Sequence, residues 1–204
     1  DSTVVEIGAK ALFDRGSFNV AVFDQEIDGL QSNIFLGTGF VLVNAGKAKV
    51  RGVELEGNWL ASNALTLGVK ATFLDNSVEE DASLGGVFDL DAAAAISDSS
   101  FSFTADYRFN LFGKDAYLRG DYQFVEATEL LANVSTDIAS SEINQLNLTA
   151  GMNFDNGLSV SLWGRNVTDD EFLWNIFPTP VQRDGLSGYR NAPATYGITV
   201  RKQF

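Results

Sequence analysis

The sequence contains no cysteine and no histidine. The absence of cysteine excludes a disulfide framework and any thiolate metal site. Without cysteine or histidine, Ser-His-Asp triads, cysteine nucleophiles and most zinc sites are also excluded. The 14 Lys and Arg residues are outnumbered by 27 Asp and Glu residues, which gives a net charge of −13. This balance argues against a nucleic-acid partner, because phosphate contacts need cationic side chains. We therefore expect no catalytic residue, no metal and no cofactor.

Long apolar runs are also missing. No run approaches the ~20 residues of a membrane-spanning helix, and no segment resembles a signal peptide. If the chain meets a membrane, it must do so as a closed β-barrel, because hydrocarbon satisfies no backbone hydrogen bonds. The first residue already lies inside a strand pattern, so we expect the chain to be a fragment of a longer protein.

Apolar and polar residues alternate through the chain, and the last stretch shows the pattern clearly. Tyr196, Ile198 and Val200 fall on one side of an extended strand. The strand pattern closes on the aromatic residue Phe204, where a soluble domain usually has loose polar residues. An aromatic at the end of a membrane strand lies in the interfacial belt. The final stretch therefore favours an outer-membrane barrel over a soluble β-sandwich, which remains the alternative.

About nine strands of this kind are expected, in an antiparallel up-and-down order. Short turns alternate with longer loops at 31–39, 75–99, 126–141 and 168–190, as in barrels with short periplasmic turns and long outer loops. An odd count indicates missing strands, because bacterial single-chain barrels have an even number. Aromatic residues at the short-turn end predict a girdle at one membrane interface, with the C-terminus in the periplasm; they are Phe13, Trp59, Phe109, Phe154 and Phe204.

Three segments resemble the TonB-dependent outer-membrane receptors. The chain reads N-A-G-K-A-K-V-R-G-V-E-L-E-G-N-W over 44–59, G-R-N-V-T-D-D-E-F over 164–172 and Y-R-N-A-P-A-T-Y-G-I-T-V-R-K-Q-F over 189–204. The resemblance spans the whole chain in order. Ala194 departs from the family pattern, in which an Arg is common before Thr-Tyr-Gly.

The resemblance implies that residues 1–204 are the C-terminal part of a 22-stranded barrel in the outer membrane of a Gram-negative bacterium. A plug domain and a TonB box, both absent from this sequence, would complete the receptor. The implied function is TonB-energised uptake of a scarce nutrient, with a ferric siderophore as the first expectation. Cobalamin and oligosaccharide uptake, a passive porin and an outer-membrane enzyme are the alternatives. The expected partners are lipid, lipopolysaccharide, the plug, TonB and a small nutrient.

Glu54 and Glu56 are the first candidate site residues, because alternation places both on the polar side of a strand. The resemblance implies that they pair with arginine residues of the plug. The alternative is that they are solvated carboxylates with no partner.

Two loops hold the other candidates. One loop is acidic and suggests a calcium site; its residues are Glu79, Glu80, Asp81, Asp89 and Asp91. No EF-hand spacing is present, so a solvated outer loop is favoured. In the last loop, aromatic and arginine side chains suit an anionic ligand, although such loops also pack on one another. These candidates are Trp174, Phe177, Arg183, Tyr189 and Arg190.

Overall fold

The structure is a computed structural model that describes residues 1–35, 39–80, 96–131, 134–182 and 185–204. Within these ranges the regular elements are all β-strands. They are β1 (Ser2–Phe13), β2 (Gly16–Phe35), β3 (Phe40–Leu60), β4 (Leu65–Glu80), β5 (Ser99–Leu111), β6 (Lys114–Val125), β7 (Ile143–Asn153), β8 (Leu158–Arg165), β9 (Leu173–Pro178), β10 (Leu186–Arg190) and β11 (Thr195–Lys202).

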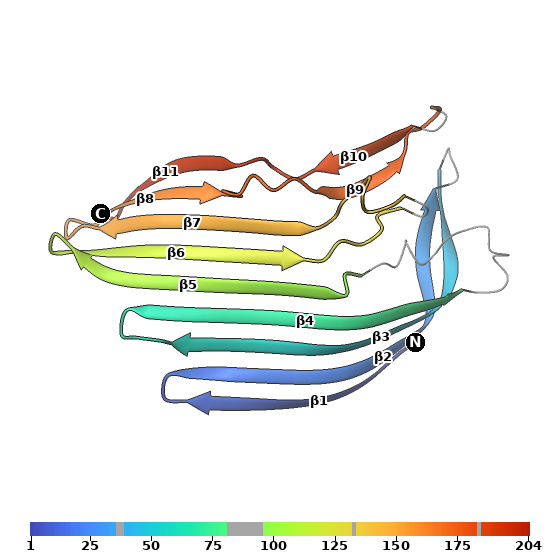
Figure 1. The fold of residues 1–204 in the computed structure, drawn as a ribbon, viewed down its shortest axis with the longest axis horizontal. Helices are drawn as coiled ribbons and strands as arrows, with labels where there is room; N and C mark the ends of the chain where they lie inside the picture. The colour runs from blue at the N-terminus through green and yellow to red at the C-terminus, as the bar shows by residue number, and fades with distance from the viewer. Residues whose placement is uncertain (36–38, 81–95, 132–133, 183–184) are drawn as a thin grey trace.

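Nine strands form one antiparallel sheet in the order β1-β2-β3-β4-β5-β6-β7-β8-β11, and β9 and β10 form a separate hairpin. Each strand of the large sheet pairs with the one before it, except that β11 follows β8 after the β9–β10 excursion. The short turns and the C-terminus lie at one end of the sheet, and the longer connections lie at the other (Figure 1). The predicted meander of about nine strands is confirmed.

The register assigns the side chains to two faces, because residues paired across neighbouring strands point to the same side. We call these the apolar face and the polar face. Two cross-strand rows on the apolar face are Ile7–Val22–Val53–Phe73 and Tyr107–Leu118–Ala150–Leu162–Ile198. The predicted division into two faces is therefore confirmed, and so is the position of the aromatic residues at the short-turn end.

The large sheet has almost no hydrophobic core. Among the described residues, the buried hydrophobic side chains are Ala48, Ala71, Ala116, Ala139, Phe172 and Ile176. By contrast, Ile7 is 77% and Ile198 is 68% exposed. A soluble sandwich would bury such a face against a second sheet, so the β-sandwich alternative is wrong. The described residues include no helix long and apolar enough to cross a membrane.

Three predicted loop boundaries are wrong. Residues 31–35 belong to β2 and pair with β3, so the connection between these strands is residues 36–39. Strand β4 continues to Glu80, and the predicted loop over 168–190 contains the hairpin of β9 and β10. Glycine, asparagine and charged residues suggested loops at these places. Backbone pairing between neighbouring strands satisfies the N–H and C=O groups there and overrides that composition.

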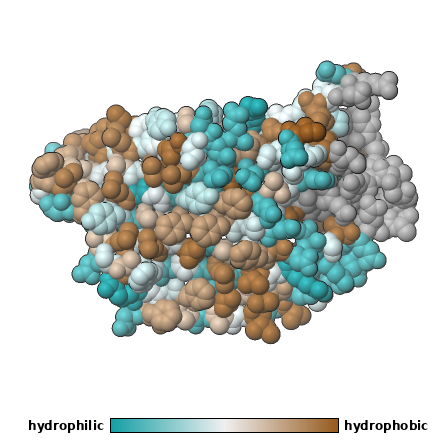
Figure 2. Space-filling view, in the orientation of Figure 1, coloured by the Kyte–Doolittle hydropathy of each residue, from teal (hydrophilic) through white to brown (hydrophobic). Residues whose placement is uncertain are grey.

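Strands β2 and β3 are 20 and 21 residues long, about twice the roughly 9–11 residues that a membrane strand needs. Beyond Val22 and Val53 the pattern of these strands reverses, with charged side chains on the apolar face and apolar side chains on the polar face. The next apolar-face positions are Asp24 and Arg51, and charged side chains continue from there. The ion pairs are Arg51–Asp24 (2.7 Å), Lys47–Glu26 (2.6 Å), Lys47–Asp28 (2.9 Å) and Lys49–Glu26 (3.3 Å). A cluster of hydrophilic residues lies near this end in Figure 2.

The polar face becomes apolar at the same level. Phe23 and Leu74 pack over Gly52, where a Cβ atom would lie 2.7 Å and 2.6 Å from their side chains. In a membrane barrel, such a part of β2–β4 would project beyond the bilayer, with its charged side in water. In this projecting part, the ammonium groups of Lys47 and Lys49 hold the pKa of the Glu26 carboxyl below its usual value.

Candidate functional site

Glu54 and Glu56 both lie on the polar face, as predicted, but their surroundings differ. Glu56 pairs with Lys70 across β3 and β4, with 3.2 Å between Oε1 and Nζ. Glu54 faces Ala21 and Thr72 in the register, and it has no ion-pair partner among the described residues. Of the two carboxylates, only Glu54 is left without a cation in the sheet itself.

The two carboxylates share a polar hollow with residues of β1 and β2. Glu6 and Lys10 of β1 line it together with Lys70. Three acidic and two basic side chains therefore line this hollow, which leaves one excess negative charge. This half of the polar face suits a cationic partner.

The alternation analysis missed a second charged cluster, which lies on the polar face of β5, β6 and β8. We call Asp106, Arg108, Arg119, Asp121 and Arg165 the basic patch. Arg108 pairs with Asp106 at 2.8 Å, and Arg119 makes a bidentate pair with Asp121. The same alternation that places the two glutamates on the polar side of a strand also places these charged residues there.

The candidate aromatic residues near the ends of β9 and β10 do not form one cluster. Phe177 and Tyr189 lie on the same face of the hairpin, with ring centroids 5.8 Å apart. Trp174 contacts Phe172 instead, edge to face at 4.8 Å. Phe172 is 3% exposed and Trp174 is 63% exposed. The hairpin thus presents two separate aromatic surfaces, each with an exposed ring.

Of the charged candidates in the two loops, Arg190 is described by the structure, whereas several others are not. Arg190 reaches Glu171, with 3.2 Å between the guanidinium and the carboxylate, and both side chains are largely exposed. Arg183, Asp81, Asp89 and Asp91 lie outside the described residues. Within the part of the chain that the structure describes, no group of three or more acidic residues could hold a metal ion.

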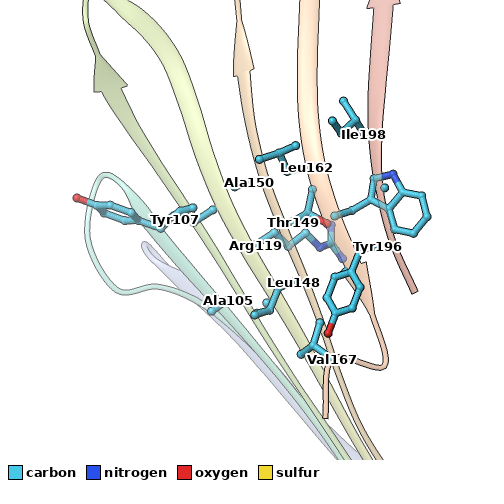
Figure 3. A pocket seen from close by; sticks show the side chains of 15 residues that line it. Ala105, Tyr107, Arg119, Leu148, Thr149, Ala150, Leu162, Val167, Tyr196 and Ile198 are labelled. Carbon is cyan, nitrogen blue, oxygen red and sulfur yellow. The ribbon is translucent and has the colours of Figure 1, made fainter. Parts of the chain in front are cut away.

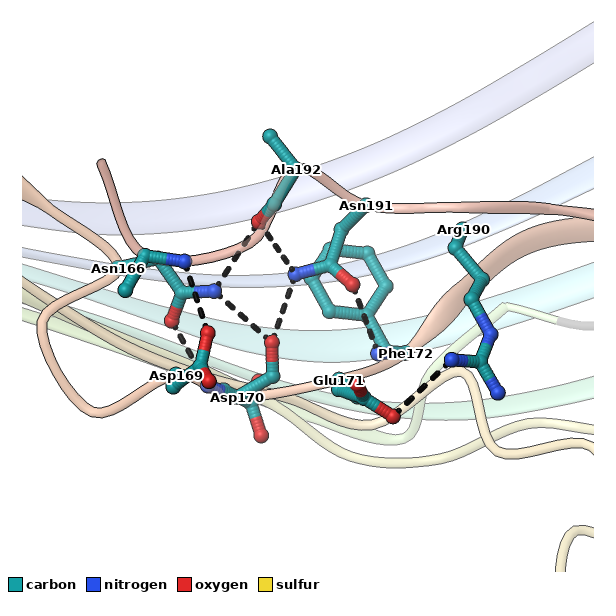
Figure 4. A network of polar contacts seen from close by, with 9 residues as sticks. Asn166, Asp169, Asp170, Glu171, Phe172, Arg190, Asn191 and Ala192 are labelled. Carbon is teal, nitrogen blue, oxygen red and sulfur yellow. Dashed lines mark hydrogen bonds and ion pairs between the residues drawn. The ribbon is translucent and has the colours of Figure 1, made fainter.

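A buried junction attaches the hairpin to the sheet (Figure 4). Asn166 directly follows β8, is 4% exposed and has a positive φ of 49°. Its side-chain amide donates to the backbone carbonyls of Asp170 (2.9 Å) and Ala192 (3.1 Å), and its Oδ1 accepts from the Asp170 N–H (2.9 Å). Asn191 donates to the same Asp170 carbonyl at 2.8 Å. One side chain therefore links the exit of β8 to the entry of β11.

Further contacts complete this junction. The Asp169 carboxylate accepts from the Ala194 N–H (2.8 Å), and Asn191 Oδ1 accepts from the Phe172 N–H (3.0 Å). These bonds join both ends of the β9–β10 excursion to each other. The hairpin is consequently held at the end of the sheet that carries the longer connections (Figure 1).

A hollow of about 850 Å³ lies on the apolar face, over β5–β8 and β11 (Figure 3). Its floor contains small residues, including Ala105, Ala150 and Gly164, and its margins carry Tyr107 and Tyr196. Arg119 also lines it, but its side chain belongs to the polar face, and the lining residues of the apolar face are uncharged. This hollow therefore suits acyl chains of lipid and not a polar nutrient.

Comparisons with known proteins agree with this architecture. A family profile described as "TonB dependent receptor-like, beta-barrel" matches residues 1–167. A search of curated proteins found no match. The matched residues run from β1 to just beyond β8 and include both polar-face clusters.

Solved structures show the same fold. The chain is similar to the ferric yersiniabactin uptake receptor FyuA from Yersinia pestis (TM-score 0.77, 16% identity, 100% of this chain and 30% of that chain). It is also similar to the ferric-catecholate import receptor Fiu from E. coli K12 (0.71, 14%, 100% and 27%) and to the copper transporter OprC (0.70, 12%, 98% and 31%). The chain spans less than a third of each of these proteins.

The profile covers well over half of the chain, and the receptors align with the whole sheet. The chain therefore belongs to the TonB-dependent receptor β-barrel family.

Proposed function

We propose that residues 1–204 form the C-terminal part of the wall of a 22-stranded outer-membrane barrel. The barrel belongs to a Gram-negative receptor that imports a scarce nutrient with energy from TonB. The observation that carries this proposal is a sheet without a core, apolar on one face and charged on the other. Such a sheet needs lipid on its apolar side and a filled or watery lumen on its polar side.

The proposed orientation follows from the two ends of the sheet. The short turns and the C-terminus face the periplasm, and the charged projections of β2–β4 face the cell exterior. Lipid and lipopolysaccharide cover the apolar face. The plug domain and the TonB box belong to the longer protein, and the plug fills the lumen beside the polar face.

A ferric siderophore is the proposed cargo. Its support is the similarity to FyuA, a ferric yersiniabactin uptake receptor, and to Fiu, a ferric-catecholate import receptor. The ligand would contact the exposed rings of Trp174 and Tyr189 and the half-buried ring of Phe177, together with Arg190, because aromatic and guanidinium groups suit an anionic chelate. Arg183 is proposed for the same contact from the sequence alone.

The test is uptake by the full-length protein in a Gram-negative strain that lacks its own siderophore receptors. Uptake of radio-iron-labelled siderophores should appear on expression and should disappear when TonB is deleted or the proton-motive force is collapsed. A passive porin would instead admit small solutes without TonB.

The cargo class is tested in the same cells. Labelled cobalamin, oligosaccharides and copper are offered beside the ferric chelates, since OprC shows that a copper transporter has this fold. TonB-dependent uptake of one of these, without iron uptake, would replace the siderophore assignment and leave the receptor assignment standing.

A further inference from the structure

The basic patch has one positive charge more than its own carboxylates neutralise. It surrounds a polar hollow of about 390 Å³ on the polar face, which would line the lumen of a barrel. The Arg108–Asp106 and Arg119–Asp121 pairs use both carboxylates. Arg165 is exposed at the end of β8, and it has no ion pair among the described residues. Three guanidinium groups therefore face two carboxylates.

The geometry prevents a simple exchange of partners within the patch. Asp106 lies opposite Arg119 across β5 and β6, so its carboxylate is between Arg119 and Arg108. The Asp121 carboxylate is held by the bidentate pair with Arg119. Asn147 of β7 separates Asp121 from the end of β8 and accepts from the Asn166 N–H at 3.0 Å. Neither Thr195, the register partner of Arg165 on β11, nor Asn147, which bonds the next residue, carries a negative charge.

Filling the lumen would remove water from this cation. A buried charge without a partner is costly, so whatever fills the lumen must supply an anion at this point. On the other half of the wall, the hollow around Glu54 has an excess of negative charge. The polar face thus has one excess negative charge at the hollow around Glu54 and one excess positive charge at the basic patch.

We propose that Arg165, supported by the Arg108–Asp106 and Arg119–Asp121 pairs, receives an Asp or Glu carboxylate of the plug domain. Together with a plug cation at Glu54, this contact sets one rotational orientation of the plug within the barrel. The inference rests on the proposed function, because it requires a plug. It assigns to the plug an acidic contact that the two glutamates alone do not indicate.

The experiment uses the full-length protein in outer membranes with a reporter cysteine in place of Thr149, which lines the hollow. The rate of maleimide labelling at this cysteine measures how closely the plug covers the patch. Labelling should be slow in the otherwise wild-type protein. Arg165→Glu should raise the rate about tenfold and Arg165→Gln by a smaller factor, as expected for loss of one partly buried ion pair. Arg165→Lys should change it less than twofold.

A charge exchange identifies the partner. In the Arg165→Glu background, the Asp and Glu residues of the plug are changed to Arg one at a time, and one of these changes should restore slow labelling. The heat-modifiable gel mobility of folded barrels is measured for each variant, and Arg165→Gln keeps the test open if Arg165→Glu does not fold.

The outcomes separate the two proposals. Fast labelling in the wild-type protein would mean that no plug covers the patch, and it would overturn both proposals. Slow labelling that Arg165→Glu and Arg165→Gln leave unchanged would overturn the carboxylate contact alone. If labelling is unchanged but the KM of nutrient uptake rises, the anion belongs to the cargo, and the assignment to the plug is wrong.

Discussion

Arg51 and Asp24 form an ion pair of 2.7 Å on the same face of the sheet that carries Val53 and Val22 one step nearer the short turns. The apolar row belongs in hydrocarbon, whereas the ion pair belongs in water or among lipid headgroups. We therefore expect the edge of the bilayer core to cross β2 and β3 between these two rows.

Nitroxide labels on β4 should report this edge. Phe73 shares the row of Val53, and Ser77 shares the row of Lys49. A label at Phe73→Cys should be accessible to oxygen dissolved in the bilayer, and one at Ser77→Cys to a water-soluble nickel chelate. The 204 residues contain no cysteine that would interfere. Equal accessibility to both quenchers at the two sites would contradict the proposed boundary.

A cation in the middle of the apolar face should destabilise the barrel. Val200 pairs with Val160 and is 65% exposed on that face. Val200→Arg should lower the unfolding free energy in lipid by about 2–4 kcal/mol if the side chain is at the bilayer midplane. The matched control is Ser161→Arg on the polar face, which should have a much smaller effect. Urea-dependent folding into vesicles measures both, and similar losses would reverse the assignment of the faces.

Loss of the Asn166 amide should loosen the β9–β10 hairpin. Asn166→Asp keeps an acceptor for the Asp170 N–H but removes the donor to the carbonyls of Asp170 and Ala192. Losing these two hydrogen bonds should cost about 1–3 kcal/mol in total, while Asn191 still donates to both carbonyls. Proteolysis within 168–194 should accelerate, while the sheet keeps its heat-modifiable mobility. Thr168→Ala serves as the control, because its bond to Asn144 is long and exposed.

Glu54 and Glu56 should respond differently to neutralisation. Glu54→Gln removes the carboxylate without a partner in the wall, so a plug cation that depends on it would lose a few kcal/mol of ion pairing. Glu56→Gln mainly breaks the exposed pair with Lys70, and exposed ion pairs contribute little because solvent screens them. Nutrient uptake normalised to receptor abundance should therefore fall more for Glu54→Gln. Equal, wild-type uptake in both variants would leave two solvated carboxylates as the better interpretation.

Labelling of intact cells should establish the orientation across the membrane. Ile138 is 75% exposed in the connection between β6 and β7, and Asn156 lies in the short turn between β7 and β8. An impermeant maleimide should react with Ile138→Cys on intact cells, and with Asn156→Cys only after permeabilisation. The reverse result would place the C-terminus outside the cell.

The sequence by itself determined the fold class, the two faces and the family. Alternation with a period of two depends only on neighbouring residues, so the apolar row of Val53 and the polar position of Glu54 could be predicted without coordinates. The family resemblance likewise depended on short contiguous segments, chiefly 44–59 and 164–172.

Only the tertiary structure decided which strands extend beyond their predicted ends and which charged side chains form ion pairs. Pairing of residues 31–35 with β3 turned an expected loop into strand, because backbone hydrogen bonds between segments outweigh local composition. The cross-strand register matched Glu56 with Lys70 and left Glu54 and Arg165 without ion-pair partners among the described residues. It also separated Trp174 from Phe177 and Tyr189. These outcomes depend on contacts between residues distant in the chain, which alternation along a single strand does not encode.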